Sequence, residues 1–261
     1  MSDASPTAAD RAALLKNSSA LAERLGVARL DVVVVEVADL GRSMRRIVIE
    51  GPGLAEIEPR PGQDLLLSVA TAGGATVRRR YTIRRHDAVA ATVAMDIVLH
   101  GDGPGARWAA NARIGDQVEV LGPRGVIGIE PDADWHLFVG DESFFPAMSA
   151  MAEALPDEKP ATVICEADEP AALPPLAPSA SRDVQLMTRV GAPGDAAALL
   201  AAAADVHLLE GRGHAYLGGE LHVVNALKRA LFERGLDESQ VSAKAYWRAG
   251  AANANHGEPE R

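Results

Sequence analysis

The chain has 261 residues, of which 48% are hydrophobic, and a formal net charge of -10. This length suits one large domain or two modest ones with a buried core, and the composition excludes a disordered chain. The acidic charge argues against a general binder of nucleic acid or anionic membranes. No apolar run reaches the length of a membrane span, the first residues lack a signal-peptide pattern, and the single cysteine, Cys165, excludes an internal disulfide. We therefore expect a cytoplasmic protein without membrane insertion.

The first half of the chain begins with a helix and continues in strands. Leucines at helical spacing predict a helix over residues 8–25. Turn signals such as Pro61-Gly62 then separate six β-rich segments, with one short helix near 106–112. The segments are residues 30–37, 44–50, 63–69, 76–85, 92–100 and 117–121. This spacing predicts a closed, antiparallel, six-stranded β-barrel over 30–126, preceded by a helical extension over 1–29.

After Pro123, strands alternate with helices. We expect strands at 135–140, 161–166, 184–188, 215–218 and 241–247, and helices at 145–154, 196–204 and 220–234. The alternation predicts an α/β domain with a doubly wound parallel sheet over 133–250. The last residues, 251–261, lack an apolar period and are predicted to form a flexible tail.

Five arginines fall within eight positions: Arg78, Arg79, Arg80, Arg84 and Arg85. In an acidic protein such a cluster indicates an anionic ligand, and the alternative is an exposed arginine-rich strand. Strand alternation puts Arg79 and Tyr81 on one face, with Thr82 on the other face or at the strand's end. A guanidinium binds a phosphate through two hydrogen bonds, and an aromatic ring stacks on a flat cofactor. The spacing therefore suits a ligand with a planar head and an anionic tail, and a core tyrosine beside solvated arginines is the alternative.

A glycine-rich loop follows the fifth predicted strand. Gly101, Gly103, Pro104 and Gly105 cannot continue a strand, and a helix starting near Ala106 offers free N–H groups and a positive dipole end to an anion. The alternative is an ordinary turn beside a core Trp108. His100 either contacts a cofactor or satisfies the loop. We expect no metal site, because no partner ligands stand at a useful spacing.

A third candidate segment, Gly140-Asp141-Glu142-Ser143-Phe144-Phe145-Pro146, follows a buried strand and precedes a helix. This is the nucleotide-loop position of an α/β domain, although the second and third glycines of the dinucleotide fingerprint are absent. The two phenylalanines either narrow a nicotinamide site or pack. Glu166 and Asp168 stand near the end of the second strand, where a 2′-phosphate requires a basic residue, and they favour NADH over NADPH.

These segments together resemble the siderophore-interacting protein family, which comprises FAD-dependent ferric-siderophore reductases of the ferredoxin-reductase superfamily. The resemblance extends from about residue 30 to residue 250 and rests on six motifs in order. They are Arg-x-Tyr-Thr-x-Arg at 79–84, residues 98–109, residues 115–116 with 121–125, Gly140-Asp141-Glu142 with Pro146-Ala147, Gly219-Glu220, and Tyr246-Trp247-Arg248-Ala249-Gly250. The family usually has a tryptophan where Tyr216 stands. The helix at 8–25 lies outside the usual pattern and is expected to cover a barrel face, mediate dimerisation or cap the flavin site.

The resemblance implies that FAD lies on the barrel and that NADH or NADPH lies on the α/β half. It implies catalytic roles for Tyr81 and Thr82 beside the flavin. The other cofactor contacts that it implies on the barrel are Arg79, Ile83, Val98, His100, Gly103, Pro104, Gly105, Ala106 and Trp108. Those that it implies on the α/β half are Gly140, Asp141, Glu142, Pro146, Glu220 and Trp247. Arg45, Arg124 and Arg248 are candidates for a rim that receives an anionic substrate.

The implied reaction is the reduction of Fe(III) in a ferric siderophore, with electrons from NAD(P)H passing through the flavin to release Fe(II). Two alternatives stay open. One is a non-catalytic or degenerate protein that binds flavin or siderophore, which the Phe144-Phe145 pair favours. The other is a related flavin reductase that uses another acceptor, or a ferredoxin as donor or partner.

Overall fold

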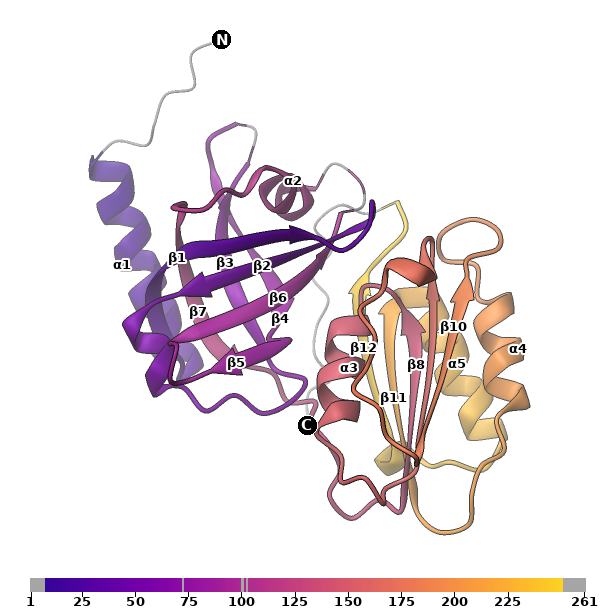
Figure 1. Ribbon diagram of the computed structural model, residues 1–261. Helices are drawn as coiled ribbons and strands as arrows, with labels where there is room; N and C mark the ends of the chain where they lie inside the picture. The colour runs from indigo at the N-terminus through magenta and orange to yellow at the C-terminus, as the bar shows by residue number, and fades with distance from the viewer. Residues whose placement is uncertain (1–7, 72, 100, 102, 251–261) are drawn as a thin grey trace. The chain divides into compact units, whose positions relative to one another are not determined.

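The computed structural model describes residues 8–71, 73–99, 101 and 103–250, so the predicted cofactor contact His100 lies outside the described residues. The chain forms two compact units (Figure 1). The first comprises Met1–Asp39 and Met44–Gly125, and the second comprises Leu40–Ser43 and Val126–Arg261. The predicted fold class, an antiparallel barrel-type sheet followed by a parallel α/β sheet, is confirmed.

The first unit is a half-barrel of seven antiparallel strands in the order β4-β3-β7-β1-β2-β6-β5. The strands are β1 (Ala28–Asp39), β2 (Met44–Glu50), β3 (Asp64–Ala70), β4 (Thr76–Thr82), β5 (Arg85–Asp87), β6 (Thr92–Val98) and β7 (Gln117–Arg124). The helices are α1 (Ala8–Leu25), η1 (Pro52–Glu56) and α2 (Pro104–Asn111).

The expected count of six strands is wrong because the segment expected as one strand, 76–85, breaks after Thr82. The chain crosses there from one edge of the sheet to the other. Ile83 N donates to Gln63 O and Arg84 N donates to Ala94 O, each at 2.9 Å. The end of β4 therefore lies at the seam where the two sheet edges approach one another.

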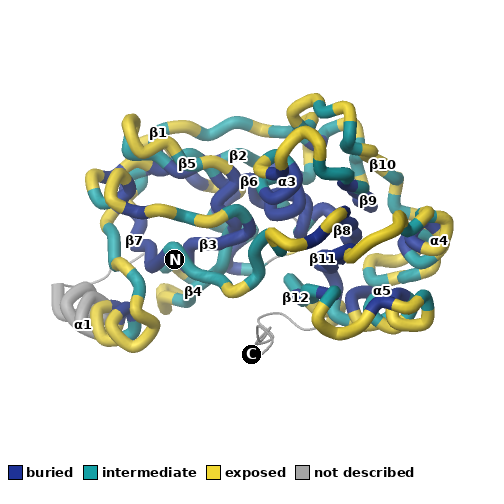
Figure 2. The backbone as a smooth tube through the Cα atoms, turned by 90° about the horizontal axis from the view of Figure 1, so that it is seen from below, coloured by how far each residue is buried: buried dark blue, intermediate teal, exposed yellow. Residues whose placement is uncertain are grey.

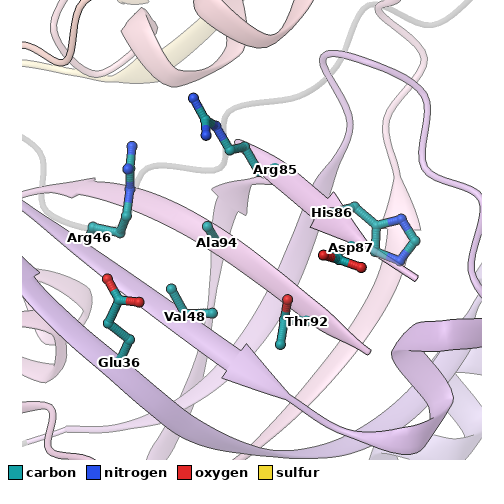
Figure 3. A pocket seen from close by; sticks show the side chains of 8 residues that line it. All are labelled: Glu36, Arg46, Val48, Arg85, His86, Asp87, Thr92 and Ala94. Atoms are coloured by element: carbon teal, nitrogen blue, oxygen red, sulfur yellow. The ribbon is translucent and has the colours of Figure 1, made fainter. Parts of the chain in front are cut away.

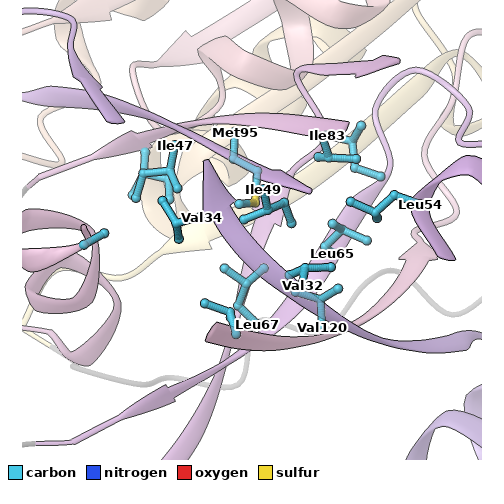
Figure 4. Packing of buried hydrophobic residues seen from close by; sticks show 14 of the residues in the cluster. Val32, Val34, Ile47, Ile49, Leu54, Leu65, Leu67, Ile83, Met95 and Val120 are labelled. Atoms are coloured by element: carbon cyan, nitrogen blue, oxygen red, sulfur yellow. The ribbon is translucent and has the colours of Figure 1, made fainter. Parts of the chain in front are cut away.

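The core of the half-barrel follows from strand alternation. In β2 the fully buried Ile47 and Ile49 alternate with the half-buried Arg46 and Val48, since successive side chains point to opposite faces. The inward side chains of the sheet, shown in Figure 4, include Val32, Val34, Ile47, Ile49, Leu65, Leu67, Met95 and Val120. Helix α2 contacts β2, β3 and β6. Its Ala109 is fully buried in this core, which fixes the helix against the sheet.

The second unit holds a five-stranded parallel sheet in the order β10-β9-β8-β11-β12. Its strands are β8 (Trp135–Asp141), β9 (Ala161–Ala167), β10 (Arg182–Thr188), β11 (Gly213–Glu220) and β12 (Val241–Trp247). Its helices are α3 (Phe145–Glu153), η2 (Pro170–Ala172), α4 (Ala197–Asp205), α5 (Leu221–Glu233) and η3 (Glu238–Gln240). The chain order reverses between β8 and β11, which makes this pair the topological switch point where ligands bind in open α/β sheets.

Strands β8 and β11 are buried along their whole length (Figure 2), as expected for parallel strands covered on both faces. Tyr216, in the place of the family's usual tryptophan, is fully buried and stacks on Phe138 at a centroid distance of 4.7 Å. Its hydroxyl accepts a hydrogen bond from Glu130 N at 2.7 Å. The tyrosine therefore fills a packing position.

None of the described helices combines the length and apolar character that crossing a bilayer requires. Within the same described ranges, no three His, Cys, Asp or Glu side chains are grouped so as to hold a metal ion.

Candidate functional site

Strand β4 presents two different faces. Its register with β3 sets Arg79 opposite Leu67 and Tyr81 opposite Leu65, and both leucines are fully buried in the half-barrel core. Directly opposed residues share a face, so Arg79 and Tyr81 lie on the inner side of the sheet. Arg78 and Arg80 consequently lie on the outer side.

The outward arginines of β4 have partners within the protein. Arg80 donates to both carboxylate oxygens of Asp64, with Nη2 at 2.6 Å from Oδ2 and Nε at 3.1 Å from Oδ1. Arg78 Nη2 donates to Ser18 Oγ at 2.8 Å. The arginine cluster therefore divides, and these two members hold the strand in place.

The inward residues of β4 meet the first turn of α2. The rings of Tyr81 and Trp108 stack, with centroids 6.3 Å apart and planes at 27°. A Cβ atom placed on Gly105 would lie 2.2 Å from the Tyr81 hydroxyl oxygen and 3.1 Å from Arg79 Cγ. The strand and the glycine-rich loop, separate in the sequence, thus form one site in which only glycine fits at position 105.

Among the described residues, the amino end of α2 at this site has no side-chain cap. Gly103 is the N-cap residue and makes no capping bond, and Pro104 occupies the first turn. The N–H groups of Gly105 and Ala106 have no acceptor within the helix, because the first turn of any α-helix leaves its donors unpaired. Such donors, together with the helix dipole, favour an anion.

The residues present fit FAD. Arg79 Nη1 donates to Arg78 O at 2.7 Å, whereas its Nη2 is buried and has no hydrogen-bond partner within the part of the chain that the structure describes. A buried guanidinium nitrogen without a partner is costly, and a phosphate oxygen would satisfy it. Burial raises the pKa of the Tyr81 phenol although the Arg79 charge opposes this, so Tyr81 stays a neutral ring with a hydroxyl donor.

Two more predicted contacts of the barrel, Thr82 and Ile83, lie at the crossing after β4. Thr82 is buried opposite Asp64, the Ile83 side chain packs in the core, and the Ile83 N–H is already bound to Gln63 O. Arg84 is buried with its Nε 4.0 Å from Asp96. Val98 ends β6 opposite Met44.

A hollow of about 350 Å³ lies on the outer face of the sheet over β1, β2, β6 and β5 (Figure 3). Arg46 and Arg85 point to the same side of this hollow, and Glu36 and Asp87 also line it, so the positive and negative side chains balance. Arg46 is paired with Asp96 through two bonds of 2.7 and 2.8 Å. No sequence motif predicts this hollow, because strand pairing alone brings these residues together.

In the parallel sheet, Asp141 joins three segments at the carboxyl ends of the strands. Its Oδ2 accepts from Glu220 N at 3.0 Å and from Trp247 Nε1 at 2.8 Å, and its Oδ1 accepts from Ser143 N at 2.9 Å. The predicted contacts Asp141, Glu220 and Trp247, distant in the sequence, therefore lie together at this edge.

Glu220 also begins helix α5. Its Oε2 accepts from His222 N at 2.5 Å and from Val223 N at 3.2 Å, and its Oε1 accepts from Ala249 N at 3.1 Å. These bonds satisfy the free N–H groups of the helix start. The carboxylate thus connects α5 to the segment after β12.

Arg189, which belongs to none of the predicted motifs, links three carboxylates at the same edge. It donates to Glu142, to Glu166 at 3.2 Å and to Asp168 at 2.6 Å. Burial and the neighbouring Asp141 charge raise the pKa of Glu142 to about 7, although Arg189 lowers it. The sequence feature that could have identified Arg189 is its position immediately after β10.

Phe144 packs at the switch point between β8 and β11. A Cβ on Gly218 would lie 2.3 Å from Phe144 Cγ, and a Cβ on Gly140 would lie 1.9 Å from Gly218 O. Phe145 is buried in α3, and Pro146 occupies the first turn of that helix. The two phenylalanines therefore serve as packing residues in this structure.

The three predicted rim arginines have different surroundings. Arg45 donates to Asp39 at 2.7 Å and to the carbonyl oxygens of Ala109 and Ala110 at the end of α2, at 3.1 and 2.7 Å. Arg124 is half-buried at the end of β7, and Arg248 is exposed after β12. Arg45 thus satisfies free carbonyl groups of α2.

Residues 67–127 match the siderophore-interacting FAD-binding domain, and residues 133–250 match the family described as siderophore-interacting protein. The crystal structure of a siderophore utilization protein from T. fusca is 30% identical, with a TM-score of 0.80 over 88% of this chain and 96% of that one. The chain belongs to the siderophore-interacting protein family. This membership confirms the resemblance, and the FAD-binding domain confirms FAD as cofactor.

Two relatives show how the similarity is distributed. An uncharacterized protein of Mycobacterium tuberculosis is 36% identical over 205 residues, which are 74% of this chain and 72% of that protein. The ferric vibriobactin reductase of Vibrio cholerae is 39% identical over 94 residues, which are 36% of this chain and 35% of that protein.

Proposed function

We propose that this protein reduces the Fe(III) of a siderophore complex with electrons from NADH or NADPH, using FAD held by β4 and α2. The observation that carries the proposal is the buried Nη2 of Arg79, which has no partner among the described residues and lies beside Tyr81 and Gly105 on the inner side of β4. The membership of the family and the reductase named among the relatives support it.

Each residue of the site has a proposed role toward the cofactor. FAD supplies, when bound, the uptake of an electron pair and its release as single electrons. Arg79 and the free N–H groups of Gly105 and Ala106 hold the phosphates, while the rings of Tyr81 and Trp108 bind flat parts of the molecule. Thr82 orients the flavin ring by hydrogen bonding, and Arg45 positions α2 through its last carbonyl groups.

The carboxyl edge of the parallel sheet is the proposed nucleotide site. Asp168, 61% exposed at the end of the second strand, is an acceptor suited to a ribose hydroxyl. Arg189 is the cation beside it, and three carboxylates already bind its guanidinium. A 2′-phosphate would compete with those carboxylates, so we infer a preference for NADH.

The substrate in this proposal is an anionic ferric siderophore, attracted by arginines such as Arg124 on the first unit and Arg248 on the second. No general acid or base is needed, because the reaction transfers electrons to iron. The protein's residues bind the cofactor, orient it and exclude water from it.

The test is the purified protein with added FAD, NADH and a ferric siderophore, with Fe(II) captured by a colorimetric chelator. The proposal expects chelated Fe(II) to form only when all three are present. Flavin that NADH does not bleach, but that reduced ferredoxin does, would move the donor role to ferredoxin.

A second candidate function is a non-catalytic binder of flavin or siderophore, and it is favoured by the position of Phe144, whose ring occupies the switch point next to Gly218. Bound flavin that no donor reduces, together with unimpaired siderophore binding, would support this candidate over the reductase.

A further inference from the structure

Helix α1 lies outside both segments that match the family, and it covers the outer face of the half-barrel (Figure 1). It contacts β1 and β7. Ala22 and Leu21 pack against Leu66 and Leu121, the outward apolar residues of β3 and β7. Of the three roles expected for this helix, the structure shows the covering of a barrel face.

A buried serine connects α1 to the sheet. Ser18 is 0% exposed, and its Oγ donates to Glu119 Oε1 at 2.5 Å. Glu119 also accepts from Ser68 Oγ at 3.0 Å and from Arg29 Nε at 2.8 Å. A buried carboxylate with three donors is well satisfied, and the loss of one donor costs stability.

The same hydroxyl holds the strand that carries the cofactor site. Ser18 Oγ accepts from Arg78 Nη2 at 2.8 Å, and the carbonyl oxygen of Arg78 accepts from Arg79 Nη1 at 2.7 Å. Strand β4 is an edge strand, paired along its length with β3 alone. An edge strand has ladder bonds on one side only, so an anchor from its outer face limits its movement.

We propose that Ser18 is a positioning residue for FAD, acting through Arg78 on Arg79. Helix α1 thereby restricts the movement of Arg79, at the phosphate end of the cofactor site, from the opposite face of the sheet. This inference rests on the proposed FAD site, and it adds an element that lies outside the regions matching the family.

The consequence of Ser18→Ala follows from the two bonds that it removes. Arg78 loses its acceptor, and Glu119 loses one donor. Strand β4 is then held less tightly beside Arg79. Losing a hydrogen bond to a charged group costs free energy, and only part of that cost reaches the neighbouring FAD site. We therefore expect FAD to bind roughly three- to tenfold more weakly. Riboflavin, which lacks the phosphates that Arg79 would bind, is expected to bind unchanged.

The experiment titrates FAD and riboflavin into the full-length apoprotein and follows the quenching of flavin fluorescence. Ser19→Ala is the matched control, since Ser19 is the adjacent exposed serine of the same helix. Arg78→Gln breaks the same contact from the other side. If the pair acts as one unit, the double variant Ser18→Ala/Arg78→Gln binds FAD about as weakly as Arg78→Gln alone. Urea unfolding of each variant checks that the protein is folded under the conditions of the titration.

A selective loss of FAD affinity in Ser18→Ala, with wild-type behaviour in Ser19→Ala, supports the inference. Equal FAD affinity in the two variants, or an equal loss for FAD and riboflavin, overturns it and leaves the proposed function intact. Additive effects in the double variant also overturn it. A wild-type protein that binds no FAD overturns the proposed function and this inference together.

Discussion

The hydroxyl of Tyr81 lies directly against the backbone of Gly105, where an added Cβ would be only 2.2 Å from the hydroxyl oxygen. This contact joins the strand that carries Arg79 to the uncapped start of α2. The donors that we propose for phosphate binding, from two separate sequence segments, are thereby fixed at one place, which is the structural basis of the proposed FAD site.

Gly105→Ala should disrupt this contact. The methyl group forces the Tyr81 ring or the first turn of α2 to shift, and well-packed sites tolerate added atoms poorly, at about 1–3 kcal/mol. We therefore expect FAD to bind roughly tenfold more weakly or worse. The control is Gly128→Ala, because a Cβ at Gly128 meets nothing within 4 Å in the described residues. Unchanged FAD affinity in Gly105→Ala would show that the cofactor does not depend on this contact.

Arg79→Lys keeps the positive charge but loses the planar fork. Lysine binds phosphate as a point charge, so we expect roughly tenfold weaker FAD binding and little change for riboflavin. Arg85→Gln, which changes an exposed arginine near the same strand, is the control. Calorimetric titration of both ligands measures the difference. Equal losses for FAD and riboflavin would assign Arg79 to the strand's stability and not to the phosphates.

Much of this site follows from the sequence. Period-two alternation places Arg79 and Tyr81 on one face, and the Gly-Pro-Gly segment at 103–105 predicts the helix start that meets them. The break after Thr82 was missed because β-rich residues continue to Arg85, and only the pairing of Arg84 with Ala94 shows the crossing. Propensity does not report which sheet edge a strand joins.

The contacts missed from the sequence share a physical cause. Arg189 binds carboxylates at the carboxyl ends of β8 and β9, and these meet only because the strands are parallel. Ser18 is followed by the exposed Ser19 in the same helix, and no periodic signal marks Ser18 as the buried one. Both are long-range polar contacts, which depend on tertiary packing and not on local pattern.

Glu142 should make stability depend on pH near neutrality. Its pKa is raised from 4.5 to about 7 in the folded protein, so the folded state binds an extra proton within that window. Stability from this group is therefore fully present below about pH 4.5 and is lost as the pH rises to 7. Glu142→Gln should gain stability relative to wild type as pH rises, measured by urea unfolding. The exposed Glu158→Gln is the control, and a constant difference across the window would contradict this role.

His136 should act in the opposite direction. Burial, aided by the charges of His214 and Lys159, lowers its pKa from 6.5 to about 4, so the unfolded state binds the extra proton between these values. Stability from this group is present above pH 6.5 and is lost as the pH falls to 4. His136→Gln should be less sensitive to acid than wild type in thermal melts, with the exposed His207→Gln as control. Parallel acid profiles of His136→Gln and wild type would rule out this contribution.

The most direct test of the central claim is the visible flavin absorbance of the FAD-reconstituted protein under anaerobic conditions. We predict an oxidised flavin spectrum that NADH bleaches and that a ferric siderophore then restores as Fe(II) appears. Absence of bound flavin after reconstitution with FAD would contradict the account.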